Sequence, residues 1–245
     1  MGKIQTLEAY LAAHEFLKDT AEFHLRLEEK FSDVQPLDLP PREKVLELIK
    51  DGVPLLQRRE FQAQILDATE KLLPEIPRML AAALLRQENL SVEKICAASE
   101  LNEILTRKNF WAAIDKLVPA ELKYWERDDW HENYCPICGR RSVMAQLKKF
   151  NEGRARHLLC GGCRTLWHWR RVGCPYCGNE NPERIHILEL NEKIRLDVCE
   201  ECGSYLKTYG GEDEENIYLR DWTTLHADLL AEEKNLRKCG AVELE

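Results

Sequence analysis

The sequence predicts a multidomain protein that combines α-helices with small β-modules. We expect an α-helical domain over residues 1–130, a first four-cysteine metal ribbon over 131–173, a second over 174–212, and a C-terminal helical segment over 213–245. Three observations predict this organisation. Apolar residues recur at helical spacing before residue 130, eight of the ten cysteines form Cys-x-x-Cys pairs after it, and a 39-residue step relates those pairs.

The first half shows helical periodicity that prolines and glycines interrupt. Apolar residues recur from Leu7 to Phe31, and the proline-rich stretch 35–41 reads as a loop. Further helices are expected over 42–51, 58–73, 77–87, 91–106 and 109–127. Ser91 is the expected cap of the fourth of these helices, and Pro119 is expected to interrupt the last. This half is long enough to bury a core of its own.

The cysteine pairs form a tandem duplication. They are Cys135/Cys138, Cys160/Cys163, Cys174/Cys177 and Cys199/Cys202. Twenty-one residues separate the two pairs of each half, and adding 39 to a cysteine of the first half gives one of the second. This spacing predicts two tetrahedral four-thiolate metal sites, formed by adjacent pairs because each 39-residue unit is then self-sufficient. Cross-brace pairing would instead interleave the pairs. We call the four cysteines from 135 to 163 site 1 and the four from 174 to 202 site 2.

Between the cysteine pairs, apolar and polar residues alternate as they do in β-strands. Residues 143–150 and 155–159 flank a turn in the first ribbon, and residues 185–190 and 194–198 flank one in the second. Each ribbon is therefore expected to run knuckle, β-hairpin, knuckle, as a zinc-ribbon or rubredoxin-like unit does. A unit of about 40 residues buries too little apolar surface to fold without its metal.

The expected cofactors are two metal ions, Zn or Fe, each bound by four cysteines. Four thiolates suit zinc and a single iron equally well. Because sulfur fills all four positions, neither site leaves one open for water or substrate, which is typical of a structural site. A disulfide framework, a thioredoxin-type redox pair and an iron–sulfur cluster are the alternatives for these thiols. Cys96 is expected in the helical core, and Cys239 is expected to be a bystander.

Charge is distributed unevenly over the chain. The net charge is −8, yet residues 135–173 carry nine basic side chains against one acidic, whereas residues 174–212 carry four basic against eight acidic. The basic excess of the first ribbon is expected either to offset the negative charge of a four-thiolate site or to bind nucleic acid. The longest uninterrupted apolar run is residues 79–85, so no segment reaches the ~20 apolar residues that a helix needs to cross a bilayer. No export signal is visible, and we expect a cytoplasmic protein.

A candidate partner surface follows the second knuckle. Trp167, Trp169, Arg170 and Arg171 would form it, because exposed tryptophan and arginine are common at the centres of protein interfaces. The alternative is a strand with a polar face around His168, in which the two tryptophans are buried and support the fold. Glycine-rich phosphate loops, His-Glu-x-x-His and a nucleophile paired with a base are all absent from the sequence.

The C-terminal half resembles the formate dehydrogenase accessory protein family (FdhE). The resemblance rests on Cys135-Pro-Ile-Cys-Gly139, Leu159-Cys-Gly-Gly-Cys163, Thr165, Trp167, Arg171, Cys174-Pro-Tyr-Cys-Gly178 and Cys199-Glu-Glu-Cys-Gly-Ser-Tyr-Leu-Lys-Thr208. It implies a helical domain followed by two rubredoxin-like metal modules. It also implies a cytoplasmic, non-catalytic role in maturing molybdenum- or tungsten-containing formate dehydrogenases, by binding their catalytic subunit.

Three functions are therefore compared. The first is an assembly factor for a formate dehydrogenase catalytic subunit. The second is a nucleic-acid-binding ribbon protein that uses the basic first repeat. The third is a thiol or iron redox protein. The acidic second repeat and the family strings favour the first. Strongly salt-dependent binding to nucleic acid would favour the second.

Overall fold

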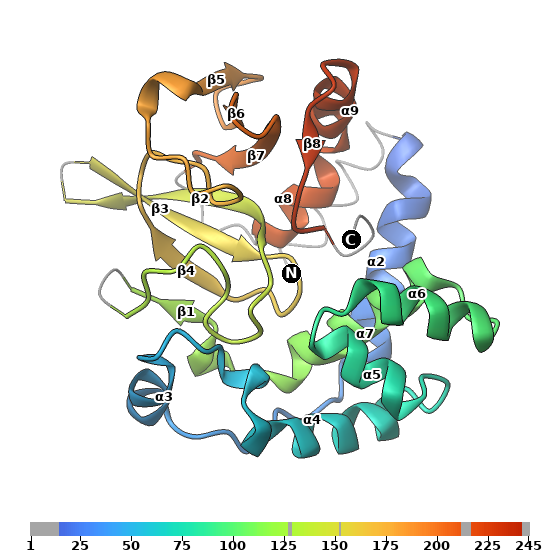
Figure 1. Cartoon of the computed structure of the whole chain (residues 1–245). Helices are drawn as coiled ribbons and strands as arrows, with labels where there is room; N and C mark the ends of the chain where they lie inside the picture. Colours follow the sequence, from blue (N-terminus) through green and yellow to red (C-terminus); the bar gives the residue numbers. More distant parts are fainter. Residues whose placement is uncertain (1–14, 127–128, 152, 212–216, 242–245) are drawn as a thin grey trace.

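The computed structural model describes residues 15–126, 129–151, 153–211 and 217–241. Figure 1 shows the helices of the first half packed beside a sheet formed by both ribbons, with the C-terminal helices between the sheet and α2. The helical pattern expected over 3–14 lies outside the described residues. Within the described part of the chain, no helix is both long and apolar enough to cross a membrane.

The helices of the first half fall close to the expected ranges, with two differences. Their bounds are η1 Glu15–Leu17, α2 Lys18–Lys30, α3 Arg42–Ile49, η2 Leu55–Gln57, α4 Arg59–Leu72, α5 Arg78–Leu85, α6 Asn89–Ala98, α7 Glu103–Leu117 and η3 Ala120–Leu122. The single helix expected over 91–106 is wrong, because Asn102 caps a new helix by accepting from the Leu105 N–H at 3.0 Å. The expected interruption at Pro119 is confirmed, because α7 ends at Leu117, but the part of the helix expected up to residue 127 is wrong, since Tyr124–Trp125 form strand β1.

The two ribbons contribute to one sheet. Its strands are β1 Tyr124–Trp125, β2 Ser142–Phe150, β3 Gly153–Cys160, β4 Leu166–Trp169, β5 Ile185–Glu189, β6 Ile194–Cys199, β7 Ser204–Tyr209 and β8 Arg237–Lys238. Both expected hairpins, β2–β3 and β5–β6, are present. Their order is β1-β4-β3-β2-β7-β6-β5, with β8 beside β7. The ribbons join where β2 and β7 pair in parallel, with Met144 opposite Lys207.

Each ribbon has a third strand after its second knuckle. β4 confirms the strand interpretation of the segment around His168. β7 was not expected from the sequence. All six of its residues are buried, so its sequence does not show the alternation of apolar and polar residues that marks a half-exposed strand. β7 also carries the sheet across the junction by pairing with β2, whereas β4 lies between β3 and β1.

The C-terminal segment forms two short helices instead of the single helix expected over 221–237. They are α8 Ile217–Thr223 and α9 Leu225–Glu233. The break lies at Thr224, whose hydroxyl donates to the carbonyl of Arg220 at 2.5 Å, while the Thr223 hydroxyl donates to that of Leu219 at 2.7 Å. Hydroxyls that bond back to the preceding turn compete with the helical pattern and bend helices.

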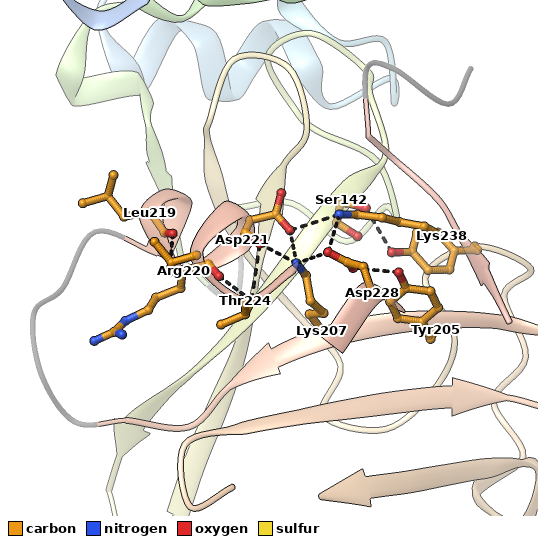
Figure 2. A network of polar contacts seen from close by, with 11 residues as sticks. Ser142, Tyr205, Lys207, Leu219, Arg220, Asp221, Thr224, Asp228 and Lys238 are labelled. Atoms are coloured by element: carbon orange, nitrogen blue, oxygen red, sulfur yellow. Dashed lines mark hydrogen bonds and ion pairs between the residues drawn. The ribbon is translucent and has the colours of Figure 1, made fainter. Parts of the chain in front are cut away.

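A buried ionic network attaches these helices to the second ribbon (Figure 2). Lys207 of β7 lies 2.7 Å from an Asp221 oxygen on α8 and 2.8 Å from an Asp228 oxygen on α9. Lys238 contacts the same two carboxylates, and the Tyr205 hydroxyl donates to Asp228 at 2.7 Å. Two lysines thus balance two aspartates, so the fully buried Lys207 ammonium is compensated.

Candidate metal centres

The structure brings the eight paired cysteines together in the two groups that adjacent pairing requires. Cys135, Cys138, Cys160 and Cys163 form one group, and Cys174, Cys177, Cys199 and Cys202 form the other. The sulfurs within each group lie within 4.8 Å of one another. Each group is therefore positioned to bind a metal ion, and neither uses the interleaved arrangement.

The sulfur spacing fits a tetrahedral ion and excludes a disulfide. In site 1, Cys135 and Cys163 sulfurs lie 3.5 Å apart and Cys138 and Cys160 sulfurs 3.3 Å apart. The corresponding two distances in site 2 are both 3.7 Å. A metal–sulfur bond of about 2.3 Å gives a tetrahedron edge of roughly 3.8 Å, whereas a disulfide needs about 2.05 Å. The donor set and its geometry thus suit Zn and Fe alike.

In three of the knuckles a backbone amide donates to the first sulfur. Ile137, Gly162 and Tyr176 donate N–H bonds to Cys135, Cys160 and Cys174 sulfurs at 3.4, 3.3 and 3.4 Å. Such bonds orient thiolate ligands and spread their negative charge. They form because the Cys-x-x-Cys turn bends the chain back over its first sulfur, so the sequence spacing fixes the local geometry.

The two sites differ in exposure. All four cysteines of site 1 are buried, whereas Cys177 is exposed and Cys202 is partly exposed in site 2. Burial raises the pKa of the Cys135 and Cys160 thiols, because a thiolate loses its hydration there. A bound cation reverses this preference and holds the ligands as thiolates.

The first knuckle of site 1 is hydrogen-bonded to the helical half. The Leu55 and Leu56 N–H groups at η2 donate to the carbonyls of Pro136 and Ile137 at 2.9 and 2.8 Å. The Gln57 side chain donates to the Cys138 carbonyl at 3.0 Å. Metal ligation in the first ribbon and the packing of the helices are therefore physically connected.

The second knuckle of site 1 needs two glycines. A Cβ on Gly161 would lie 1.8 Å from the Gly240 carbonyl oxygen, and one on Gly162 would lie 2.7 Å from the Trp111 ring. The next residue beyond the knuckle, Arg164, adopts φ 57° and contacts Asp115 at 3.3 Å and Glu28. The two glycines of the Cys-Gly-Gly-Cys string thus allow Trp111 and the chain at Gly240 to pack closely against this knuckle.

The structure corrects the expected partner surface in one respect, because Trp167 and Trp169 are buried. They stand two residues apart on β4 and so share one face, which is the face turned to the core. Trp125 of β1 lies opposite Trp167, whose indole N–H donates to the Glu132 carbonyl at 3.2 Å. Arg170 and Arg171 are exposed, and Arg170 forms an ion pair with Glu180 of the second ribbon.

The two remaining cysteines lie outside both groups. Cys96 is buried on α6, as expected for a core residue. Cys239 is partly exposed, with its sulfur 3.4 Å from the Ser204 hydroxyl. Ser204 lies two residues after Cys202 and begins β7, so Cys239 packs near the second ribbon.

The fold and these centres define a class: a helical half joined to two tandem four-cysteine ribbons. Residues 134–171 match the FdhE central domain. The chain is 25% identical over 208 residues to the FdhE proteins of Escherichia coli O127:H6 and of Shigella boydii serotype 18. Each alignment covers 74% of this chain and 65% of the relative, so it spans less than two thirds of those proteins.

A solved structure shows the same fold. The crystal structure of the FdhE protein from Pseudomonas aeruginosa matches with a TM-score of 0.55 at 19% identity, covering 89% of this chain and 85% of that one. The chain is thus similar to FdhE proteins in the sequence of its first ribbon and in its fold, in agreement with the resemblance that the cysteine strings indicated.

Proposed function

We propose that this protein is a cytoplasmic, non-catalytic accessory factor that binds the catalytic subunit of a formate dehydrogenase and supports its maturation. The observation that carries the proposal is the match of the first ribbon to the FdhE central domain. The closed four-sulfur sites agree with it. With sulfur in every coordination position, a bound ion stabilises the ribbons and offers no place for a substrate.

The basic edge at Arg170 and Arg171 is the proposed anchor for the partner. Arg171 lies near Arg195 and Asp197, and burial followed by the charge of Arg195 lowers its pKa. Asp197 is already engaged, with Arg195 at 2.9 Å and Arg156 at 3.5 Å. More positive than negative charge therefore gathers at this edge, which favours an acidic surface on the partner.

The alternative of nucleic-acid binding is not favoured by the placement of the basic residues. Arg140 and Arg156 are buried, and Arg164 is paired with Glu28 and Asp115. The basic excess of the first ribbon is thus partly used inside the fold, which leaves fewer of its side chains free to contact a phosphate backbone.

A charge-reversal series tests the proposed function. Arg170→Glu is expected to leave a folded, metal-replete protein that neither captures a formate dehydrogenase catalytic subunit nor restores enzyme activity to cells lacking this protein. Arg59→Glu, on the exposed start of α4, is the matched control and should behave as the native chain. The readouts are pull-down of the subunit and formate dehydrogenase activity of the cells.

A second variant separates binding from local structure. Arg170→Glu also breaks the ion pair with Glu180, so the swap Arg170→Glu/Glu180→Arg restores an internal pair while keeping the reversed charge. If the swap regains activity, Arg170 acts through structure and is not part of the anchor. Full activity of the Arg170→Glu variant alone would also show that Arg170 is not part of the anchor. Failure of the intact chain to bind any such subunit would overturn the functional proposal.

A further inference from the structure

The two ends of the sheet differ in length and in what contacts them. β1 forms one end with only two residues, and Arg42 donates there to the carbonyl of Tyr124. β5 forms the other end with five residues, Ile185–Glu189, in regular antiparallel register with β6. Among the strands of the described chain, none pairs with the outer side of β5. Figure 1 shows β5 at the outer end of the sheet, on the side away from α3 and α4.

The register shows which backbone groups of β5 face outward. Just beyond the two ends of the strand, the Glu200 N–H donates to the Arg184 carbonyl and the Leu190 N–H donates to the Ile194 carbonyl, both at 3.0 Å. In an antiparallel pair, residues that bond to the neighbouring strand alternate with residues whose N–H and carbonyl groups point away from it. The even-numbered residues of β5 therefore bond to β6, and the odd-numbered residues face the open edge.

These odd-numbered residues leave a set of donors and acceptors at the edge. The Ile185 N–H is already used, because it donates to the Pro182 carbonyl of the preceding turn. The Ile185 carbonyl, both backbone groups of Ile187 and the Glu189 N–H are not bonded to any other described residue. An added strand could therefore form a short ladder centred on Ile187.

The sequence of β5 does not protect this edge. Edge strands that must stay unpaired often contain lysine, proline or a bulge, and β5, which reads Ile-His-Ile-Leu-Glu, has none of the three. Leu188 packs against a cluster that includes Ala227 of α9, so one face of the strand is held in place. Ile187 is 50% exposed and presents an apolar side chain at the centre of the open edge.

The surface around β5 is acidic. Exposed glutamates lie in the strand and near both of its ends, at Glu183, Glu189, Glu192, Glu200 and Glu201. The exposed basic residues there are Lys193 and Arg184, and Arg184 pairs with Glu200 and Glu201. Five carboxylates against two cations leave three negative charges in excess, even with both cations counted in full. A protonated His186, 2.6 Å from Glu200, would still leave two.

We propose that β5 is a docking edge for an extended, basic segment of a partner protein, which joins the sheet as an additional strand. Hydrogen bonds to the outward groups of β5 supply affinity, and alternate side chains supply specificity. The partner residue opposite Ile187 is apolar and β-branched, and the residue opposite Glu189, two positions away, is lysine or arginine. Charge complementarity selects this segment over neutral or acidic strands.

A second copy of this chain fits the edge less well. Two β5 strands paired antiparallel would place Ile187 against its counterpart, but they would also bring two acidic surfaces together, which opposes association. The contact uses other residues than the basic edge at Arg170 and Arg171. It also does not depend on the proposed formate dehydrogenase role, because the chemistry of the edge defines the segment that it binds.

Amide hydrogen exchange of the full-length, metal-replete chain, followed by nuclear magnetic resonance, tests the proposal with a synthetic probe. The probe is the capped peptide Arg-Thr-Lys-Thr-Val-Thr-Val, and its acidic counterpart has Glu in place of Arg and Lys. At ten times the Kd of the basic peptide, exchange of the Ile187 and Glu189 amides should slow about tenfold, because they are then free about a tenth of the time. The amides of His186 and Leu188, which bond to β6, should change little.

Two variants locate the binding. Ile187→Pro removes the outward N–H without removing a bond to β6, and edge positions of this kind tolerate proline. It should abolish the slowing at Glu189. Glu189→Lys leaves the backbone intact, so it tests the same contact if the proline variant does not fold, and it should weaken binding of the basic peptide about fivefold. Glu93→Lys, on the exposed surface of α6, is the matched control.

Three results would overturn the proposal. Exchange at Ile187 and Glu189 that does not slow with millimolar basic peptide would show that no strand is added. Equal slowing by the acidic peptide, or equal weakening by Glu189→Lys and Glu93→Lys, would refute the basic partner. Slow exchange at these amides without peptide, increasing with protein concentration, would show that a second copy occupies the edge instead.

Discussion

The two ribbons share one cysteine register but differ in what surrounds their metal sites. The first knuckle of the first ribbon is bonded to η2 of the helical half, and the first knuckle of the second is bonded to the first ribbon, where the Tyr176 hydroxyl donates to the Ser142 carbonyl at 3.1 Å. Each module thus docks on the part of the chain before it. The first ends up enclosed, and the second has one exposed cysteine and one partly exposed.

The residues between the cysteines account for much of this difference. The first ribbon has Gly161 and Gly162 in its second knuckle where the second has Glu200 and Glu201. The glycines allow Trp111 and the chain at Gly240 to approach closely, whereas the glutamates are exposed and form ion pairs with Arg184. The two residues between the cysteines of the second knuckle, which bind no metal, therefore help to determine whether a metal unit is buried or exposed.

Arg164 and Gly203 extend the comparison by one position beyond the second knuckle. Both have positive φ, 57° and 66°, in the region that favours glycine. The second ribbon uses glycine there, and a Cβ added to Gly203 would meet no described atom within 4 Å. The first ribbon accepts the backbone strain of an arginine, which costs of order 1 kcal/mol, because the guanidinium reaches Glu28 and Asp115 of the helical half.

The largest expected difference between the ribbons is the effect of losing a metal site. Cys174→Ser/Cys177→Ser should abolish one of two bound ions and unfold the second ribbon, while the helices keep their circular dichroism. Cys135→Ser/Cys138→Ser should abolish the other ion and also destabilise the helical half, because that knuckle accepts hydrogen bonds from Leu55 and Leu56. Each loss removes about 10 kcal/mol or more of metal-binding free energy.

Elemental analysis and far-ultraviolet circular dichroism of the purified variants measure this difference, and the same elemental analysis decides between zinc and iron. One ion or none per native chain would contradict the two-site interpretation. Equal loss of helix in both variants would break the comparison, and it would also count against an independent helical domain over residues 1–130, which stays a prediction.

A smaller difference is expected at the second knuckles. Gly161→Ala should lower the free energy of unfolding by about 1–3 kcal/mol, as overpacking against fixed atoms does, because the added carbon meets the Gly240 carbonyl. Glu200→Ala at the equivalent position should change it by roughly 0.5 kcal/mol or less, since exposed ion pairs contribute little. Urea unfolding of the two variants provides the measurement. Similar costs at both positions would show that burial of the first knuckle does not depend on its glycines.

The sequence was sufficient for the features that local spacing determines. Cysteine register predicted the two metal groups, and alternation predicted both hairpins within a few residues. It was not sufficient for contacts between distant segments. The parallel pairing of β2 with β7 joins residues 63 positions apart, from Met144 to Lys207, and leaves no local pattern.

The tryptophans show the same limit. Trp167-x-Trp169 indicates that both rings share a face, but the strand that pairs with β4, β1, comes from a segment that reads as the end of a helix. Likewise, Ser91 was expected to cap a helix, but it lies inside α6, which begins at Asn89, and the side-chain cap is instead Asn102 at the start of α7. Tertiary contacts decide among local signals of similar strength.

The smallest expected difference concerns pH. The first ribbon has His157 on β3 where the second has Leu196 on β6. His157 lies 3.0 Å from the Tyr124 hydroxyl, and burial, then Lys148 and His168, lower its pKa from 6.5 to about 4. A histidine with a lowered folded-state pKa stabilises the fold fully above pH 6.5, and this contribution declines as the pH falls toward 4, because the unfolded chain takes up the proton first.

His157→Gln should therefore make the loss of stability between pH 6.5 and 5.5 shallower, by at most about 1.4 kcal/mol per pH unit. Urea unfolding of both proteins at pH 6.5, 6.0 and 5.5 measures the two slopes, and protonation of the cysteine ligands cancels because both proteins share it. Leu196→Gln is the control for placing an amide in the equivalent strand, and it should lower stability equally at all three pH values. Parallel pH profiles for the native chain and His157→Gln would show that His157 is not held neutral, and that the ribbons do not differ in this respect.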